Sequence, residues 1–492
     1  MRKIITAILG AALVAGLAGC SAQSTQQTDS KYANIESELN FTERDMDASY
    51  DESTATVIDL SGNTAQVRGE GAQANGSKVS ITAEGTYIVR GTLGNGTIDV
   101  SLPSDDSSAQ IVLDGTNIHN DAGPALQVSK GDAVYLTLAD GSKNALSDGT
   151  GYALEAGEDE AQATLCTASD LTINGSGSLN VNGAYYHAIS SQGAVIITGG
   201  NIDIESAEDG AFANGAIKIG DGDITINAGD DGLHSEYLLY VADGTVDVQQ
   251  SEEGFEAERI YIYGGNSSIV SNDDGVNASQ AEAEKEASES DAANEAPAVP
   301  EGNMGEPAAR PDGEMSEPPA DAPQMSDRQK PERPEEDGGK SPAEGQGMQQ
   351  PGGLDNKQEN APDIDDAYLI RINGGALTVN AGGDGLDSNG YIEINGGTVL
   401  VSGASSADDS GLDYEYGATV NGGDVILVGA AGMAEDFTGG TQAHLMERLN
   451  GNAGSTVEVK DASGNVLVSY VVPKAFEAVT ASAPGAASIS VK

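Results

Sequence analysis

A short turn of acidic residues and glycine recurs at a nearly fixed interval through the middle of this chain, and apolar and polar residues alternate between its copies. Uninterrupted copies start at positions 187, 209, 231, 253 and 274, so the steps are 22, 22, 22 and 21 residues. A unit of this length cannot bury an apolar face alone and has to stack on its neighbours. The period therefore predicts a solenoid.

Each unit contains two short strands that flank a glycine-containing turn. In the units at 195–204 and 217–226, aliphatic residues occupy every second position on both sides of the turn, as in strands with one buried face. Equivalent aliphatic residues of parallel strands would stack about 4.8 Å apart and fill the interior. The predicted fold class is all-β, a parallel β-helix, with a short stack of turn asparagines at Asn373, Asn395 and Asn421.

The composition agrees with many tight turns rather than with one round core. The 492 residues include 65 Gly and no Trp, and the formal net charge is −55. Such a charge excludes electrostatic binding of nucleic acid or of anionic lipid headgroups. It favours cation binding, solubility outside the cell, or both.

Residues 1–19 are a predicted lipoprotein signal peptide, because a basic start and an apolar stretch precede Leu17-Ala18-Gly19-Cys20, which resembles a bacterial lipobox. Lipidated Cys20 would anchor the protein to a bacterial membrane, on the extracytoplasmic surface, with residues 20–53 as a tether. An ordinary secretory signal is the alternative. The other cysteine, Cys166, lies in a strand-like run, which predicts a small buried hydrophobe.

The rest of the chain divides by composition. Residues 54–278 and 367–440 form the two parts of the predicted β-helix, and residues 441–492 form a strand-rich cap for its open end. The two parts of the β-helix are separated by the Pro-, Glu- and Met-rich insert 279–366. It has too few apolar residues to offset the entropy lost on ordering, so it is predicted to be disordered. It leaves and re-enters at one turn of one coil.

Stacking would turn the acidic turns into a column of carboxylates, which repel one another unless a cation or a proton intervenes. Calcium suits such turns because it takes about six to eight oxygen ligands in flexible geometry. Asp-Gly turns selected for backbone geometry are the alternative, but they do not explain the further acidic residues before and after the pair. The predicted Ca²⁺ ligands are Asp209, Asp230, Asp231, Glu253, Glu256, Asp273, Asp274, Asn277, Asp384, Asp387, Asp409 and Asp413.

Zinc is not predicted, because the four histidines form no ligand cluster along the sequence. His187 and His234 occupy turn positions and are expected to be solvated. Because Trp is absent, the aromatic residues available for sugar contacts are tyrosines. The predicted ligand-binding tyrosines are Tyr237, Tyr391, Tyr414 and Tyr416.

Segments Gly85–Leu93, Ile111–Ile118 and Leu138–Gly149 resemble the opening of bacterial carbohydrate-binding domain-containing proteins, and Asp384–Asp387 is similar to the Asp-Gly-Leu/Ile-Asp turn of that family. The resemblance covers most of residues 54–440. It implies a right-handed parallel β-helix, related in shape to polysaccharide lyases, with bound calcium and affinity for acidic sugars such as polygalacturonate.

Three functions remain open at the level of sequence. The preferred one is a monomeric, non-catalytic cell-surface lipoprotein that binds acidic polysaccharide with calcium. A pectate-lyase-like enzyme would need calcium and a base, and the repeat region offers mainly Lys218, Arg259 and Arg371, without a recognisable catalytic set. The third is a structural spacer or adhesin stiffened by calcium.

Overall fold

A computed structural model describes residues 32, 35–152, 163–279, 361–405 and 409–492. Within these ranges the helical elements are α1 (Ile35–Glu38) and the 3₁₀ turn η1 (Ile364–Asp366), and all other regular elements are strands. No described helix is long and apolar enough to cross a membrane. Most of the predicted insert, 280–360, and the predicted signal peptide with Cys20 lie outside the described residues.

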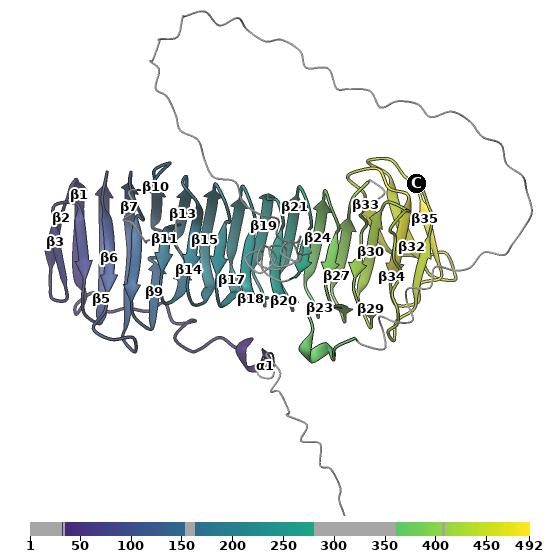
Figure 1. Cartoon of the computed structure of the whole chain (residues 1–492), viewed down its shortest axis with the longest axis horizontal. Coiled ribbons are helices and arrows are strands. Elements are labelled where there is room, and N and C mark those ends of the chain that lie inside the picture. Colours follow the sequence, from purple (N-terminus) through teal and green to yellow (C-terminus); the bar gives the residue numbers. More distant parts are fainter. Residues whose placement is uncertain (1–31, 33–34, 153–162, 280–360, 406–408) are drawn as a thin grey trace, which may run out of the picture. The chain divides into compact units, whose positions relative to one another are not determined.

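Parallel strands stack side by side in one long row (Figure 1), and their pairings define three faces around one core, so the predicted parallel β-helix is confirmed. Face 1 contains β1 (Thr56–Gly62), β5 (Gly85–Leu93), β7 (Ser108–Asn120), β9 (Ala133–Leu138), β12 (Asp170–Gly175), β15 (Val195–Ser206), β17 (Ala216–Asn227), β18 (Leu233–Val241), β20 (Phe255–Ile262), β23 (Leu369–Ile372), β26 (Tyr391–Ile394) and β29 (Gly417–Val420). Several of these strands are long and bend into a neighbouring face.

Face 2 contains the starts of β18 and β20, together with β4 (Lys78–Ile81), β6 (Thr97–Ser101), β8 (Leu126–Lys130), β11 (Ala163–Thr167), β14 (His187–Ser191), β16 (Ala211–Ala213), β22 (Val276–Ala278), β25 (Leu386–Ser388) and β28 (Asp413–Tyr414). Face 3 contains the ends of β5, β7, β15 and β17, together with β10 (Lys143–Asp148), β13 (Ser178–Gly183), β19 (Thr245–Gln250), β21 (Asn266–Ser271), β24 (Ala376–Ala381), β27 (Thr398–Ser402) and β30 (Asp424–Gly429).

The core consists of aliphatic ladders that run from coil to coil. On face 1, for example, Ile197 pairs with Ile219, Ile219 with Val241, and Val241 with Ile262, and all four are at most 1% exposed. β20 then pairs directly with β23, so Ile262 lies next to Ile372 although the long insert separates them in sequence. The aliphatic alternation of the sequence thus becomes one continuous apolar interior.

Turn asparagines form the predicted stack. Asn395 Nδ2 donates to Asn373 Oδ1 at 2.8 Å, and Asn421 Nδ2 donates to Asn395 Oδ1 at 2.8 Å. The amide of Asn395 thus donates to one neighbour and accepts from the other, which ties successive coils together outside the core.

Antiparallel strands follow the last coil. β31 (His444–Glu447) and β30 both pair with β34 (Ala478–Ser482), while β32 (Thr456–Lys460) forms a three-stranded sheet with β33 (Val466–Val471) and β35 (Ser488–Val491). At the other end, β2 (Thr64–Arg68) and β3 (Ala72–Asn75) pair antiparallel with β1 and β4. Both ends of the parallel stack therefore carry strands of the opposite direction.

An N-terminal strap, residues 35–55, lies along the outer side of face 1. Gln110 Nε2 donates to Ser49 O at 3.2 Å, Thr172 Oγ1 donates to Asp45 Oδ1 at 2.8 Å, and Lys218 Nζ donates to Asn40 O at 2.7 Å. The strap thus crosses successive coils on its way back to β1. Part of the segment predicted to be a tether is packed chain, and its contacts bury outward-facing residues of face 1.

Glycine in the acidic turns is required by the close approach of the next coil. A Cβ on Gly232 would lie 2.6 Å from Gly254 O and 2.9 Å from a methyl carbon of Val248. We expect Gly232→Ala to lower the free energy of unfolding by roughly 1–3 kcal/mol in urea titrations. Gly439→Ala, where a Cβ meets nothing within 4 Å, is the control, and equal midpoints for both variants would contradict this packing.

Cys166 is a buried thiol in β11, as predicted, and burial raises its pKa to about 12. Because the thiolate is the reactive form, we expect no reaction with Ellman's reagent at pH 8 in the native chain lacking residues 1–20. One thiol per chain should react after unfolding in guanidinium. Fast labelling of the native protein would contradict the buried position.

Candidate functional site

The acidic turns join face 3 to face 2 and lie above one another in a file. In this turn column, the N–H of each turn glycine donates to the carbonyl oxygen of the acidic residue one coil further, from Gly210 to Asp231 at 2.8 Å and from Gly232 to Glu253 at 2.9 Å. The same bonds continue along the file, with Gly254 to Asp274 at 3.0 Å, Gly275 to Asp384 at 2.9 Å and Gly385 to Ser410 at 3.0 Å. The insert does not interrupt the column, because Asp384 follows Asp274 in space.

One carboxylate oxygen of most column residues is used by the backbone of the next coil. Asp209 Oδ1 accepts from Asp231 N at 3.1 Å, and Asp231 Oδ1 accepts from Glu253 N at 3.2 Å. Asp274 Oδ1 likewise accepts from Asp384 N at 2.6 Å, and Asp384 Oδ1 from Ser410 N. These bonds fix the carboxylates in position and leave the second oxygen of each group for another partner.

Two histidines lie at the start of the column, where sequence spacing predicted no cluster. His187 and His234 both approach Asp209 Oδ2, at 3.4 and 3.5 Å, and their side chains are only 12% and 10% exposed. The expectation of solvated histidines without a ligand cluster is therefore wrong. They are 47 residues apart in the sequence (234 − 187), and coil stacking brings them together through the 22-residue period.

In the middle of the column, three carboxylates lie close together, and one of them accepts from a buried amide. Ligand oxygens of Asp231, Glu253 and Glu256 lie within 4.8 Å of one another. Asn277 Nδ2 donates to Glu253 Oε2 at 2.8 Å, while Asn277 Oδ1 is buried without a partner among the described residues. Burial, together with the neighbouring carboxylate of Glu256, raises the pKa of Glu253 to about 9.

At the C-terminal end of the turn column, the predicted metal ligands are all carboxylate oxygens. Burial and the carboxylates of Asp274, Asp413 and Asp387 raise the pKa of Asp384 to about 8, and Asp387 pairs with Asp413 across β25 and β28. Gly383 occupies the turn position that carries an acidic residue in other coils. A Cβ there would collide with carboxylate oxygens of the preceding coil. The space beside these carboxylates is therefore kept free of a side chain.

The remaining predicted ligands are the first acidic residues of the turns. Asp230 N donates to Glu208 O at 3.4 Å, and Asp273 N donates to Glu252 O at 2.9 Å, so these residues also stack. Asp409 acts electrostatically on Asp274, whose pKa is raised to about 6 mainly by burial. The file ends at Ser410, whose hydroxyl bonds within its own turn.

The four predicted sugar-binding tyrosines do not form one surface. Tyr237 stacks on Tyr32 at 6.1 Å, beside the strap. Tyr391 lies 5.6 Å from Tyr416 and donates to Pro362 O at 2.9 Å. Tyr414 packs on the core and donates to Asp436 O at 2.8 Å, so these rings have structural partners.

A different run of rings leads into the column. Tyr152 stacks on Tyr185 at 4.5 Å, and Tyr186, which is 39% exposed, meets His187 edge-on at 4.3 Å. His187 in turn stacks on Phe212 at 5.2 Å. The sequence signal for these rings is the presence of Tyr186-His187 in the first turn, where the later turns carry two acidic residues.

The three bases considered for lyase chemistry lie on face 1 or under the strap. Lys218 donates to two strap carbonyls, Glu38 O and Asn40 O. Arg259 is 1% exposed, and Arg371 Nε pairs with a carboxylate at 2.6 Å. None of the three faces the turn column.

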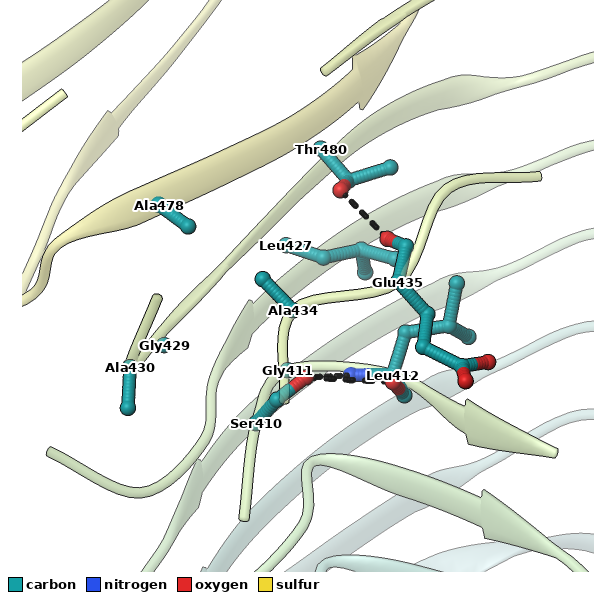
Figure 2. A pocket seen from close by; sticks show the side chains of 10 residues that line it. All are labelled: Ser410, Gly411, Leu412, Leu427, Gly429, Ala430, Ala434, Glu435, Ala478 and Thr480. Atoms are coloured by element: carbon teal, nitrogen blue, oxygen red, sulfur yellow. Dashed lines mark hydrogen bonds between the residues drawn. The ribbon is translucent and has the colours of Figure 1, made fainter. Parts of the chain in front are cut away.

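A cavity at the end of the column is too small for a sugar. It is lined by Ser410, Leu412, Leu427 and Thr480, among others, and has a volume of about 10 Å³ (Figure 2). This is room for about one water molecule. This cavity therefore cannot hold a polymer ligand.

The fold and site define a parallel β-helix with a longitudinal column of carboxylates. Residues 75–306 match a family model described as "Carbohydrate-binding domain-containing protein", which confirms the resemblance expected from the sequence. A curated protein of that description from Acetivibrio thermocellus is 30% identical over 138 residues, which is 28% of this chain and 48% of that protein. The chain thus covers about half of that relative's length.

A solved structure is also similar, titled as a polysaccharide lyase-like protein from C. thermocellum. It is 26% identical in sequence, and the alignment covers 44% of this chain and 90% of that chain, with a TM-score of 0.41.

Proposed function

We propose that this protein binds acidic polysaccharide without cleaving it, through Ca²⁺ ions held along the turn column. The main supporting observation is the file of buried carboxylates from Asp209 to Asp384, in which burial and neighbouring charges raise the pKa values of Glu253 and Asp384, so that a bound cation would stabilise the ionised forms. A calcium ion that keeps open coordination positions would accept carboxylates of a polymer. The match to a carbohydrate-binding family supports a sugar ligand.

Calcium fits the oxygen-only part of the column best. Asp274, Asp384, Asp387 and Asp413 would hold the ion there, since their carboxylates interact and, among the described residues, no basic side chain is a cause of the pKa shifts of Asp274 and Asp384. Gly383 lets the carboxylates of Asp273 and Asp274 approach the backbone of this turn closely, because a Cβ there would collide with them. Bound calcium would supply positive charge to a surface that otherwise repels an anionic chain.

Binding without catalysis is supported by the state of the candidate bases. Lys218, Arg259 and Arg371 are engaged by the strap, by backbone carbonyls or by a carboxylate. A lyase needs a base within hydrogen-bond reach of the proton that it removes. The proposed location is a bacterial cell surface, with lipid on Cys20 as the membrane contact and a monomeric body.

Polygalacturonate coupled to beads tests the proposal. The chain from residue 21 onward should be retained in 1 mM CaCl₂ and released by EGTA, with no rise in absorbance from unsaturated products. Rising absorbance would replace binding with lyase activity. Passage through the beads in calcium, with the chain fully folded, would leave a spacer as the function.

A further inference from the structure

His234 is surrounded by three carboxylates from three successive coils. Its Nδ1 lies 3.5 Å from Asp209 Oδ2, 3.1 Å from Asp231 Oδ2 and 3.5 Å from Glu256 Oε2. A protonated Nδ1 has one hydrogen, and N⁺–H···O⁻ bonds are typically about 2.7–2.9 Å long. One proton can bond Asp231 Oδ2 at 3.1 Å, but it leaves the oxygens of Asp209 and Glu256, both at 3.5 Å, without a hydrogen.

The same spacing suits ligands around a small divalent ion, and the ligand atoms of Asp209, Asp231 and His234 all lie within 4.8 Å of one another. Zinc–nitrogen and zinc–oxygen bonds are about 2.0–2.2 Å, so neighbouring donors of a tetrahedral site lie roughly 3.3–3.6 Å apart. The nitrogen of His234 is 3.1–3.5 Å from its three carboxylate neighbours.

Hydrogen bonds already orient each carboxylate toward the imidazole. The Oδ1 atoms of Asp209 and Asp231 accept backbone N–H groups of the next coil. Ser279 Oγ donates to Glu256 Oε1 at 2.9 Å. In each of the three carboxylates, one oxygen accepts a hydrogen bond while the other faces His234. Contacts of this kind position the ligands of metal sites.

The imidazole itself is an incompletely partnered buried group. His234 is 8% exposed, and its Nε2 is buried without a hydrogen-bond partner among the described residues. Phe212 contacts the ring edge-on at 5.1 Å. The ring is therefore held by packing, with Nδ1 turned toward the carboxylates.

We propose that His234 Nδ1, with Asp209, Asp231 and Glu256, binds a first-row divalent transition-metal ion such as Zn²⁺, at a site chemically distinct from the oxygen-only calcium region. Imidazole suits Zn²⁺ and its neighbours, whereas Ca²⁺ takes oxygen ligands. The ion replaces the Nδ1 proton and balances two of the three carboxylate charges. His187 is a positioning residue, because its Nδ1 accepts from Asp209 N at 3.2 Å. This proposal does not depend on the sugar-binding function.

The test uses untagged chain from residue 21, stripped of metal and titrated with Zn²⁺ by competition with a chromophoric chelator. We expect one tight site, with His234→Gln weakening zinc binding by at least about 100-fold, more than the 10–100-fold typical of second-shell changes. His119→Gln, which changes a histidine paired with Asp121 in an earlier coil, should bind normally. Asp384→Asn should weaken calcium binding and leave zinc binding unchanged.

X-ray absorption of the zinc-loaded wild-type chain makes the proposal independent of variant folding. It should show one imidazole among oxygen ligands. Absence of a tight zinc site, an oxygen-only shell, or undiminished zinc affinity in His234→Gln would each overturn the proposal. Failure of polygalacturonate retention would not bear on it, so the two proposals fail separately.

Discussion

Replacement of Asp274 and Asp384 by Asn should abolish most of the stabilisation that calcium gives this protein, while stabilising the metal-free protein. In the wild type, calcium at about 100 times its Kd would add about 2.7 kcal/mol to the free energy of unfolding. The variant lacks the two charges but keeps Oδ1 acceptors for the N–H groups of Asp384 and Ser410. The coil stack should therefore remain intact.

The metal-free half of this prediction follows from the raised pKa values. Asp384 has a pKa of about 8 in the fold, well above that of an unfolded aspartate, so folding takes up a proton between these values. The stability of wild-type protein in EGTA should therefore fall as pH rises from about 5 to 8. The Asn variant should lose less over the same range.

Urea unfolding with and without calcium, at pH 5.5 and pH 8, measures both effects. Asp247→Asn, on the outer side of face 3 where Asp247 accepts from Gln249, should keep the wild-type response to calcium. An equal calcium effect in wild type and in the double variant would show that the oxygen-only region does not hold the ion.

Arg259→Met should lower the free energy of unfolding by about 3–5 kcal/mol, the cost of breaking a buried charged network. Arg259 is 1% exposed, and its Nη1 donates to the carbonyls of Ile364, Asp365 and Ala367 at 3.0–3.2 Å. Its guanidinium also lies 4.6 Å from the ring centre of Tyr32. Methionine fills similar space but leaves buried carbonyl oxygens without donors.

This arginine joins the residues that follow the insert to the chain just before the strap. We therefore expect faster proteolysis of both segments in Arg259→Met, with cuts located by mass spectrometry. The matched control is Arg68→Met, whose side chain is 64% exposed and paired with Asp59, and which should change stability by less than about 1 kcal/mol. Equal unfolding midpoints for the two variants would contradict the anchoring role.

Much of the site was predictable because the repeat defines the register. A 22-residue period places Asp209, Asp231 and Glu253 at one corner of the coil whatever the details of packing. The position of the insert was also predictable, since the pattern stops after Asn277 and resumes in phase before Asp384. The repeat keeps its register on both sides of an insertion, because each coil contacts only its neighbours.

The histidine cluster was missed because ligand spacing was sought along the chain. His187, His234 and Glu256 belong to different coils, and no short-range motif links them. The sequence also did not show which neighbours cover the predicted tyrosines. A side chain such as Tyr237 points outward from its strand whether solvent or the strap covers it. Strand periodicity predicts that a side chain points outward, but not which other segment of the chain packs over it.

By itself, the sequence determined the period, the strands, the aliphatic interior and the acidic corner, because these properties repeat locally and stacking copies them from coil to coil. Only the tertiary structure decided which side chains of different coils meet at His234, and that residues 35–55 close over face 1. Those contacts join positions far apart in sequence, and their free energy depends on distance and burial, which no local pattern encodes.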